Sequence, residues 1–463
     1  MNRANCYLLV YFYITLIYLI LQETNMFLKR QTAAAMLTLG FVLSPLLVPE
    51  NADAIPAFSR QHKTECSTCH TIYPELNEFG DAFLKNSYVW PHKKKGANQP
   101  SAGAQGGEPA GNEWATISGL PQYVPISLTA TADLAYDDDA FDGNKLNLST
   151  RSLTLHAGGS FRDVAGFFAT YNLYSQGGFH TTSAPFTPAS NTNNPPNNDP
   201  DIDELFFVWR HALDSPVNLK VGRFEPKLSL WKKSNRILPV PSYASTTYLV
   251  GISPFSSDAT EDGVELNAVV GNRLFVAAGV VDRDGQDRED GYGHISYKFG
   301  GTTLKGEEPE VDLESDSVWD FLSVTCGVFG YWGQNGEINN GIAQNLNNFR
   351  RIGAEADILY KRLHLKGSGS FGRDSNPTFS VARREVDSRA YTLEGEYYLG
   401  APINLVPLFR YEHLDTGEGG TKRFIPALAY SPLQNLKLSL EYIRSNAPEG
   451  NSNTAFASLA FSL

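Results

Sequence analysis

The sequence has few charges, few cysteines and few long apolar stretches, and each shortage excludes a class of protein. Charged residues make up 19% of the 463 residues, and 50 acidic residues outnumber 38 basic ones, so the net charge of −12 argues against a nucleic-acid-binding protein. Four cysteines are too few for a disulfide scaffold of this length. Long apolar stretches are confined to the N-terminal region, which argues against a bundle of membrane helices.

Aromatic residues and glycine are abundant instead, with 22 Tyr, 27 Phe and 40 Gly. Transmembrane β-strands give only a weak hydropathy signal, because apolar and polar side chains alternate along each strand. A composition with few charges, many aromatic residues and many glycines therefore leaves room for a transmembrane β-barrel.

Residues 1–54 have the features of a targeting leader. Two apolar stretches, residues 6–21 and 33–48, open the chain, and the second follows Lys29 and Arg30 and ends at an Ala-x-Ala cleavage pattern. A membrane anchor is the alternative, although a span needs about 20 apolar residues. We therefore expect a signal peptide that is cleaved after Ala54.

The distance from Met26 to this cleavage pattern is an ordinary signal-peptide length. We therefore expect synthesis to begin at Met26 and the mature chain to begin at Ile55, in an oxidising compartment. All three methionines lie upstream of the cut. The cysteines downstream of it are Cys66, Cys69 and Cys326, and the last of these lies in a strand-like segment, where we expect an inert wall residue.

Residues 66–70 read Cys-Ser-Thr-Cys-His, the attachment pattern of a c-type haem. Two thiols at this spacing can reach the two vinyl groups on one edge of a porphyrin, and His70 is then placed to be the proximal iron ligand. A disulfide, half of a zinc site and a thioredoxin-type redox pair are the other readings of Cys66 and Cys69. Zinc would need a second ligand pair, and none occurs at suitable spacing. The motif therefore predicts one covalently bound c-type haem.

A helix is predicted directly after the motif. Pro74 suits the first turn of a helix, and Glu75 and Glu78 suit its positive end. Apolar residues at helical spacing follow, including Phe79 and Phe83, and form a stripe that we expect to cover the haem. Gly80 would let the backbone come close to the haem.

These residues together resemble a known family. Residues 56–61 fit the pattern P-x-F-x-R-Q, residues 66–70 fit C-x-x-C-H, and residues 74–83 fit P-x-L-N-x-F-G-x-x-F, followed by Tyr88. This order is similar to the haem segment of the fused outer-membrane cytochrome–porins of iron-oxidising and metal-respiring bacteria. The resemblance covers only residues 56–88. It implies a porin-like barrel after the haem segment and electron transfer across the outer membrane, with Fe(II) favoured as the donor.

The second iron ligand is predicted to be a histidine, because the mature chain has no methionine. His92 ranks first, since the chain can fold back after Pro91 over the other haem face. His62 ranks second, since it lies only four residues before Cys66. Either histidine could instead be a solvated surface residue.

The rest of the chain is predicted to be an outer-membrane β-barrel, with residues 55–92 as the haem segment and 93–122 as a linker. From residue 123 to 463, segments of about ten residues alternate in polarity, as in a lipid-facing wall around a polar or packed lumen. A soluble array of β-sandwiches is the alternative. Sixteen segments are counted, beginning near Tyr123, Lys145, Val164, Asp201, Val217, Glu261, Arg273, Gly291, Ser317, Phe349, Arg362, Arg389, Pro402, Lys422, Asn435 and Thr454.

The connections between these segments alternate in length. Residues 176–200, 225–260 and 374–388 are long and predicted to be external loops, whereas 271–272 and 400–401 are short turns. This layout places both termini in the periplasm. The acidic runs 137–142 and 282–290 fall in external loops, where they are either solvated or able to attract hard cations such as Fe(II). Residues 300–316 are too long for a turn, which leaves room for a misplaced strand.

A haem segment of under about 40 residues rarely builds its own core, so we expect it to lodge inside the barrel. The predicted function is outer-membrane electron transfer between periplasmic cytochromes and an extracellular donor or acceptor such as Fe(II). Any enzymatic activity would be at most that of a metal oxidoreductase. Two alternatives stay open: a diffusion porin with a haem-bearing plug, and a monohaem enzyme of the peroxidase type.

Overall fold

The computed structural model describes residues 57–62, 64–90, 126–138, 145–161, 164–175, 201–238, 242–283, 289–309, 317–339, 342–417, 419–448 and 450–463. The leader at residues 1–54, the expected starts at Met26 and Ile55, the linker at 93–122 and the candidate ligand His92 lie outside the described residues.

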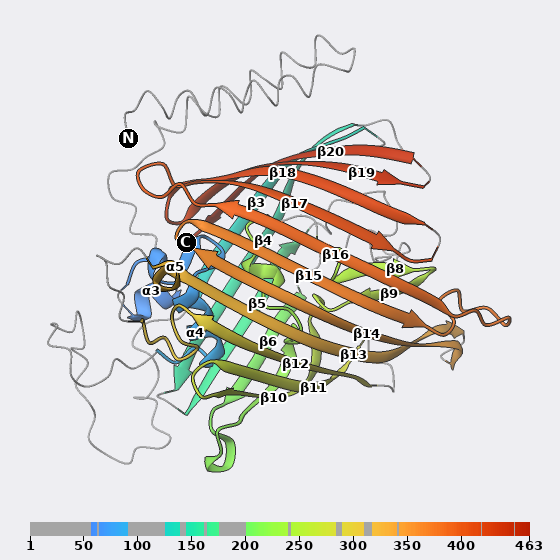
Figure 1. The fold of residues 1–463 in the computed structure, drawn as a ribbon, viewed down its shortest axis with the longest axis horizontal. Helices are drawn as coiled ribbons and strands as arrows, with labels where there is room; N and C mark the ends of the chain where they lie inside the picture. The colour runs from blue at the N-terminus through green and yellow to red at the C-terminus, as the bar shows by residue number, and fades with distance from the viewer. Residues whose placement is uncertain are drawn as a thin grey trace, which may run out of the picture. The chain divides into compact units, whose positions relative to one another are not determined.

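Sixteen antiparallel strands form a closed barrel, in which β20 pairs with β3 to complete the ring (Figure 1). The predicted all-β fold class is confirmed, and all sixteen predicted segments correspond to strands. The strands are β3 (Ile126–Asp137), β4 (Leu146–Phe161), β5 (Ala165–Ser175), β6 (Asp201–Trp209), β7 (Asn218–Phe224), β10 (Glu261–Val270), β11 (Leu274–Asp282), β12 (Glu289–Gly300), β13 (Leu322–Asn339), β14 (Ile342–Tyr360), β15 (Leu363–Asp374), β16 (Val386–Tyr397), β17 (Leu405–Asp415), β18 (Gly420–Leu433), β19 (Leu436–Ala447) and β20 (Gly450–Ser462).

The polarity of the wall is the reverse of that of a soluble protein. Along β15, Leu363 and Leu365 are exposed on the outside, whereas His364 and Lys366 between them are buried inside. Because side chains alternate across a strand, this register sends the two leucines outward and His364 and Lys366 into the lumen. The closed ring of strands contradicts the β-sandwich alternative.

Aromatic residues mark both edges of the apolar outer surface. One set lies close to the strand termini at the end of the barrel that holds Ile126 and Leu463. A second set lies toward the opposite end. Such aromatic girdles are typical of barrels that cross a bilayer. Outward-facing aromatic residues include Phe161, Trp209, Phe299, Tyr397 and Phe461 in the first set and Tyr171, Trp332 and Phe371 in the second.

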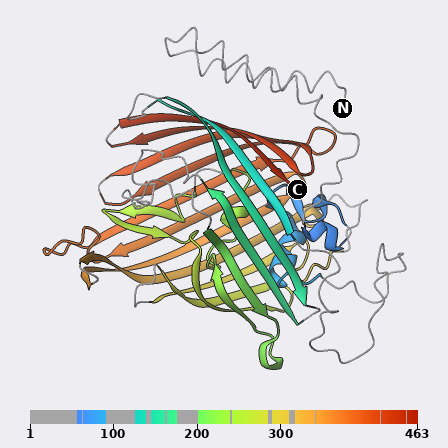
Figure 2. The same cartoon turned by 180° about the vertical axis from the view of Figure 1, so that it is seen from behind.

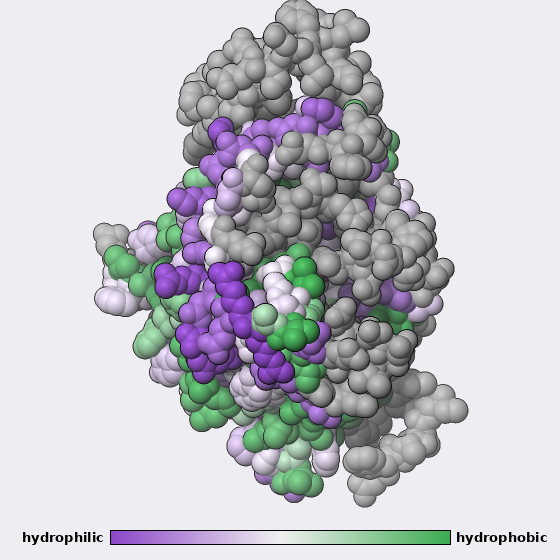
Figure 3. Space-filling view, turned by 90° about the vertical axis from the view of Figure 1, so that its right-hand side faces the viewer, coloured by the Kyte–Doolittle hydropathy of each residue, from purple (hydrophilic) through white to green (hydrophobic). Residues whose placement is uncertain are grey.

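The two ends of the barrel differ in their connections. We call the end that holds Ile126 and Leu463 the terminal end, and the opposite one the loop end. Turns at the terminal end are short, as between β10 and β11 or β14 and β15, whereas the connections from β5 to β6 and from β7 to β10 are long and lie at the loop end. Figure 3 shows the loop end, where hydrophilic residues gather in the upper and central part of the described face and hydrophobic residues lie beside and below them.

The connection from β12 to β13 is the exception at the terminal end. It carries the short helix α5 (Val318–Phe321), and β12 pairs directly with β13 from Gly300 and Ser323 onward. The strands on either side of this connection are neighbours in the ring, and its described residues, 301–309 and 317–321, contain no further strand.

The connection at residues 225–260 is not an external loop, as its length had suggested, but folds into the lumen. It contains the hairpin β8 (Thr247–Val250) and β9 (Ser253–Ser256), which lies within the ring of strands in both views (Figures 1 and 2). Its Tyr243 is fully buried and donates a hydrogen bond to Glu394 of β16 at 2.7 Å. Its backbone at Ala244 donates to Glu412 of β17 at 2.9 Å. Buried apolar side chains drive this insertion, because exposing them at the loop end would cost free energy.

The acidic runs also differ from simple solvated loops where the structure describes them. Asp290 is buried, forms an ion pair with Arg283, and accepts a hydrogen bond from Tyr331 at 2.8 Å. Asp138 accepts hydrogen bonds from Asn453 on β20. Residues 139–142 and 284–288 lie outside the described residues. In the described part of the chain, no helix is both long enough and apolar enough to cross a membrane.

The wall can be tested with a charge on its outer face. Val328 is 55% exposed and lies in β13 between the two aromatic sets. We expect Val328→Arg to lower the free energy of unfolding from lipid vesicles by about 2–4 kcal/mol, since the guanidinium would enter hydrocarbon. Leu213→Arg is the control, because Leu213 is more exposed but lies in a terminal-end turn, and it should change stability by less than about 0.5 kcal/mol. Equal costs in urea titrations of the two variants would contradict a lipid-facing wall.

Candidate functional site

The segment that carries the Cys-x-x-Cys-His motif is a small mixed fold at the terminal end (Figure 2). It consists of α3 (Ala57–His62), the 3-10 turn η3 (Cys66–Thr68), β1 (His70–Ile72), β2 (Glu75–Leu76) and α4 (Glu78–Lys85). The predicted helix thus begins later than expected, because Pro74 and Glu75 belong to the β1–β2 hairpin. Asn77 caps α4 instead: its side-chain oxygen accepts a hydrogen bond from the Gly80 amide at 2.9 Å.

Cys66 and Cys69 are both free thiols, which sets aside the disulfide reading. Burial raises the pKa of each thiol, for Cys69 to about 11 with a further contribution from Cys66. A thioredoxin-type pair works through a thiolate of lowered pKa, so these thiols do not fit that chemistry. The one group of three potential metal ligands that converges within the described residues contains neither cysteine, which also disfavours zinc.

His70 is oriented by the hairpin that follows it. Its Nδ1 donates to the backbone carbonyls of Pro74 at 3.1 Å and Glu75 at 3.2 Å, so the lone pair of the ring is left on Nε2. Burial lowers the pKa of His70 and favours the neutral imidazole. A neutral ring whose Nδ1 is held by a carbonyl is the usual state of a metal-binding histidine.

His62 lies in the aromatic core of the same segment. Its ring stacks on Trp90 with centroids 4.4 Å apart and meets the edge of Phe83 at 5.6 Å. Burial lowers the pKa of His62 to about 4, and its Nε2 has no hydrogen-bond partner in the part of the chain that the structure describes. A buried ring nitrogen without a partner is costly unless something binds it, so His62 fits the role of second iron ligand, whereas the first-ranked His92 is outside the described residues.

Asn77 and Gly80 fix the motif against α4. The Asn77 side chain donates to the carbonyls of Ser67 and Thr68, both at 3.1 Å, and its backbone amide donates to the carbonyl of Cys69 at 2.9 Å. A Cβ on Gly80 would lie 2.1 Å from the same Cys69 oxygen. A side chain at this position would therefore separate α4 from the motif.

Aromatic rings attach the segment to the barrel wall. Phe58 of α3 stacks on Tyr88 at 5.4 Å, and Tyr88 stacks in turn on Phe168 of β5 at 5.4 Å. The backbone oxygen of Ser87 lies so close to Gly166 of β5 that a Cβ there would be 1.9 Å away. The segment is thus packed inside the barrel, as expected for a chain too short to build its own core.

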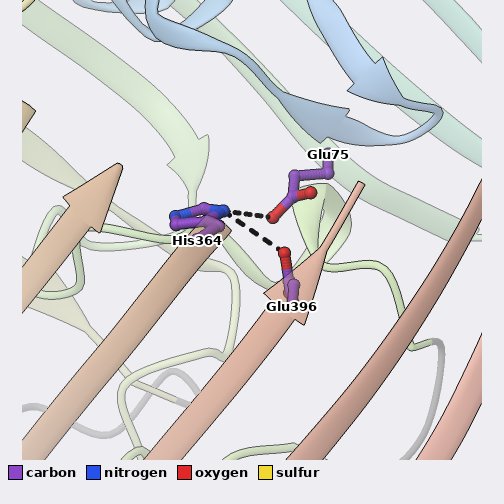
Figure 4. A group of neighbouring side chains, drawn as sticks. All are labelled: Glu75, His364 and Glu396. Carbon is purple, nitrogen blue, oxygen red and sulfur yellow. Dashed lines mark ion pairs between the residues drawn. The ribbon is translucent and has the colours of Figure 1, made fainter. Parts of the chain in front are cut away.

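A buried group of charges makes the second attachment (Figure 4). Glu75 forms ion pairs with Lys366 and, at 3.2 Å, with the Nδ1 of His364, both on β15. Glu396 of β16 is 3.2 Å from the same Nδ1 and 2.6 Å from the Lys366 ammonium. Burial alone would raise the pKa of Glu75, but the charges of Lys366 and His364 outweigh it and bring the pKa to about 2. Glu75 therefore stays ionised at neutral pH.

The residues present fit a covalently bound haem. A c-type haem needs two thiols for covalent attachment, and the segment offers two free ones. It also needs imidazole nitrogens as iron ligands, and the segment offers His70, oriented by carbonyls, and the unpartnered Nε2 of His62. Next to Trp90 lies a cavity of about 240 Å³, and Lys85, Arg210 and Lys305 contribute to its lining. Cationic side chains of this kind suit haem propionates.

Comparisons with known proteins describe the barrel but not the motif. No protein-family model matches the sequence, and no curated protein matches it either. Among solved structures, OmpT of Vibrio cholerae is similar over 73% of this chain and 98% of its own, at 10% identity and a TM-score of 0.49. An anion-selective porin from Comamonas acidovorans covers 73% and 99% at 10% identity and a TM-score of 0.48. The outer membrane channel DcaP of Acinetobacter baumannii covers 73% and 96% at 12% identity and a TM-score of 0.46. The barrel itself is established by the strand pairing of this chain.

Sequence reasoning identified the motif but missed its partners on the wall. Lys366 lies 291 residues after Glu75, and His364 and Glu396 are similarly remote in the sequence. The only local signal was that each of them is a charged or titratable residue on the lumen side of a strand, a feature shared by many other residues of this barrel.

The contact between α4 and the motif gives a specific test. Gly80→Ala should push α4 away from Cys69, lower the free energy of unfolding by about 1–3 kcal/mol, and reduce the ratio of haem to protein after expression with a haem-attachment system. Gly293→Ala is the matched control, because the nearest atom to its Cβ would be 3.8 Å away. Unchanged haem content in Gly80→Ala would argue against the role given to this contact.

Proposed function

We propose that the chain is an outer-membrane cytochrome–porin that carries single electrons between periplasmic cytochromes and an extracellular donor or acceptor such as Fe(II). In this proposal Cys66 and Cys69 hold one c-type haem, His70 is its proximal ligand and His62 its distal ligand. The observation that carries it is the position of the Cys-x-x-Cys-His segment: it is packed inside a closed membrane-type barrel and brings two neutral imidazoles with it.

Each protein group has a defined task in this function. The two thiols fix the position of the porphyrin, and the carbonyls of Pro74 and Glu75 hold the His70 ring so that Nε2 faces outward from the hairpin. The rings of Trp90 and Phe83 hold His62. When bound, the haem supplies a one-electron iron couple.

The contents of the lumen support an electron-transfer role over a diffusion role. Inward-facing charges are paired and buried, as in the Arg351–Asp374 pair at 2.8 Å and the Arg410–Glu394 pair at 2.7 Å. The inserted loop at 225–260 packs against these side chains. A lumen filled in this way insulates a redox centre from bulk water.

The outer membrane is the proposed location because the outer wall is an apolar band between two sets of aromatic residues. The haem segment at the terminal end would face periplasmic cytochromes. The loop end, with its hydrophilic surface in Figure 3, would face the medium.

Electron transfer can be measured in liposomes that contain the haem-loaded protein and enclose a soluble c-type cytochrome. External Fe(II) should reduce the enclosed cytochrome, or an external ferric complex should oxidise it, when the wild-type chain is present. The Cys66→Ser/Cys69→Ser double variant should abolish this exchange, because the haem would no longer be retained. Passage of small neutral solutes without electron exchange would identify a diffusion porin instead.

The ligand set can be read from visible spectra. The wild-type ferric protein should be low-spin with two nitrogen ligands, and His62→Ala should become high-spin and bind added imidazole. His413→Ala is the control, because His413 lies near the loop end of β17, where it stacks on Tyr391. It should leave the spectrum unchanged. A high-spin wild-type spectrum would point to an open iron position and the peroxidase alternative, whereas a low-spin His62→Ala spectrum would transfer the role to His92.

A further inference from the structure

Three metal-ligating side chains converge beside the haem segment. The Nδ1 of His364 lies 3.2 Å from a carboxylate oxygen of Glu75 and 3.2 Å from one of Glu396. All three potential ligand atoms lie within 4.8 Å of one another, and no other such group of three occurs in the described ranges. Figure 4 shows the three side chains pointing toward a common centre, Glu75 from the N-terminal segment and the others from neighbouring strands.

The donor set and its support are those of a first-row metal site. One imidazole nitrogen with two carboxylates suits divalent iron, manganese or zinc, whose bonds to such ligands are about 2.0–2.2 Å long. The other nitrogen of His364, Nε2, is 2.7 Å from the carboxylate of Asp357. A carboxylate on the far side of a ligating histidine fixes the ring, so that Nδ1 would present its lone pair to a metal ion once the ion has displaced the proton from Nδ1 to solvent. The Trp231 indole in turn donates to Asp357 at 3.0 Å.

The same group is linked directly to the proposed proximal iron ligand. The backbone oxygen of Glu75 accepts a hydrogen bond from Nδ1 of His70 at 3.2 Å, while the carboxylate of Glu75 reaches His364. A cation held by the Glu75 carboxylate would therefore be linked through this one residue to the ring that would bind the haem iron. Electron tunnelling falls steeply with distance, so a site beside the haem segment favours electron transfer.

In this structure the ammonium group of Lys366 lies between the carboxylates that would bind a metal ion. Its ammonium contacts Glu75 and, at 2.6 Å, Glu396, and it also reaches Glu394 at 3.4 Å. These contacts neutralise two carboxylates that would otherwise repel each other. A divalent cation would offset the same two negative charges, and the Lys366 ammonium would then keep its contact with Glu394.

We propose that Glu75, His364 and Glu396 form a binding site for a divalent first-row metal ion, Fe(II) in the working protein, in competition with Lys366. Binding of the ion stands on the geometry of these side chains alone. Its identity as the electron donor rests on the proposed function. In that step the bound Fe(II) loses one electron to become Fe(III), and the ferric haem accepts this electron to become ferrous.

Binding can be measured with Mn(II) as the probe, by the loss of the free-ion EPR signal during titration of the full-length, haem-loaded protein. His364→Ala should weaken one class of Mn(II) site by about tenfold or more, and Asp357→Asn should weaken it by about 10–100-fold, since it removes the support of the ring. Lys366→Met should strengthen the same site, because the competing ammonium is gone. Fe(II) should bind at least as well as Mn(II).

His294→Gln is the matched control, because His294 forms the same kind of pair with Glu355, at 2.9 Å and fully buried, outside the group of three. It should leave Mn(II) binding unchanged.

The site is refuted if wild type and His364→Ala bind Mn(II) equally, or if Lys366→Met stays folded and gains no affinity. Haem content and reduction by dithionite are recorded in every variant, so a protein that holds reducible haem but binds no Mn(II) refutes only this site. A protein that binds Mn(II) and holds no haem refutes the proposed function instead.

Discussion

Closure of the sheet is the constraint on which the rest of this structure depends. A strand in hydrocarbon cannot leave its backbone groups unpaired, and the pairing of β20 with β3 removes the last free edge. Closure then separates the two faces of every strand: large apolar side chains are exposed on the outer face, whereas the lumen face holds most of the buried charges together with apolar clusters. Sixteen strands enclose a wide space, so the interior must either fill with water or be packed by other parts of the chain.

Two segments from different parts of the chain pack this lumen. The loop at 225–260 brings buried side chains such as Tyr243 to the carboxylates of β16 and β17, and the N-terminal segment places its rings against β5. Buried carboxylates of the wall such as Glu394 and Glu412 gain hydrogen bonds in this way, which offsets part of the cost of burying their charge. The barrel in turn supplies the core that so short an N-terminal segment lacks.

Glu75 joins the anchoring of the segment to its proposed chemistry. Its backbone oxygen orients the His70 ring, and its carboxylate forms the ion pairs with β15 that hold the segment in place. The same carboxylate belongs to the proposed metal site, so docking, iron ligation and cation binding are coupled through one residue.

The sequence by itself determined the features that depend on neighbours along the chain. Alternation with a period of two located all sixteen strands, and the spacing of Cys66, Cys69 and His70 specified the proposed haem site. The start of α4 was misplaced because the capping role of Asn77 outweighs the suitability of Pro74 for a first turn. Only the tertiary structure decided that residues 225–260 turn inward and that Glu75 meets His364 and Lys366. These contacts join residues far apart in sequence, whose approach is set by the closed ring and by the need to pair buried charge, and neither condition leaves a local pattern.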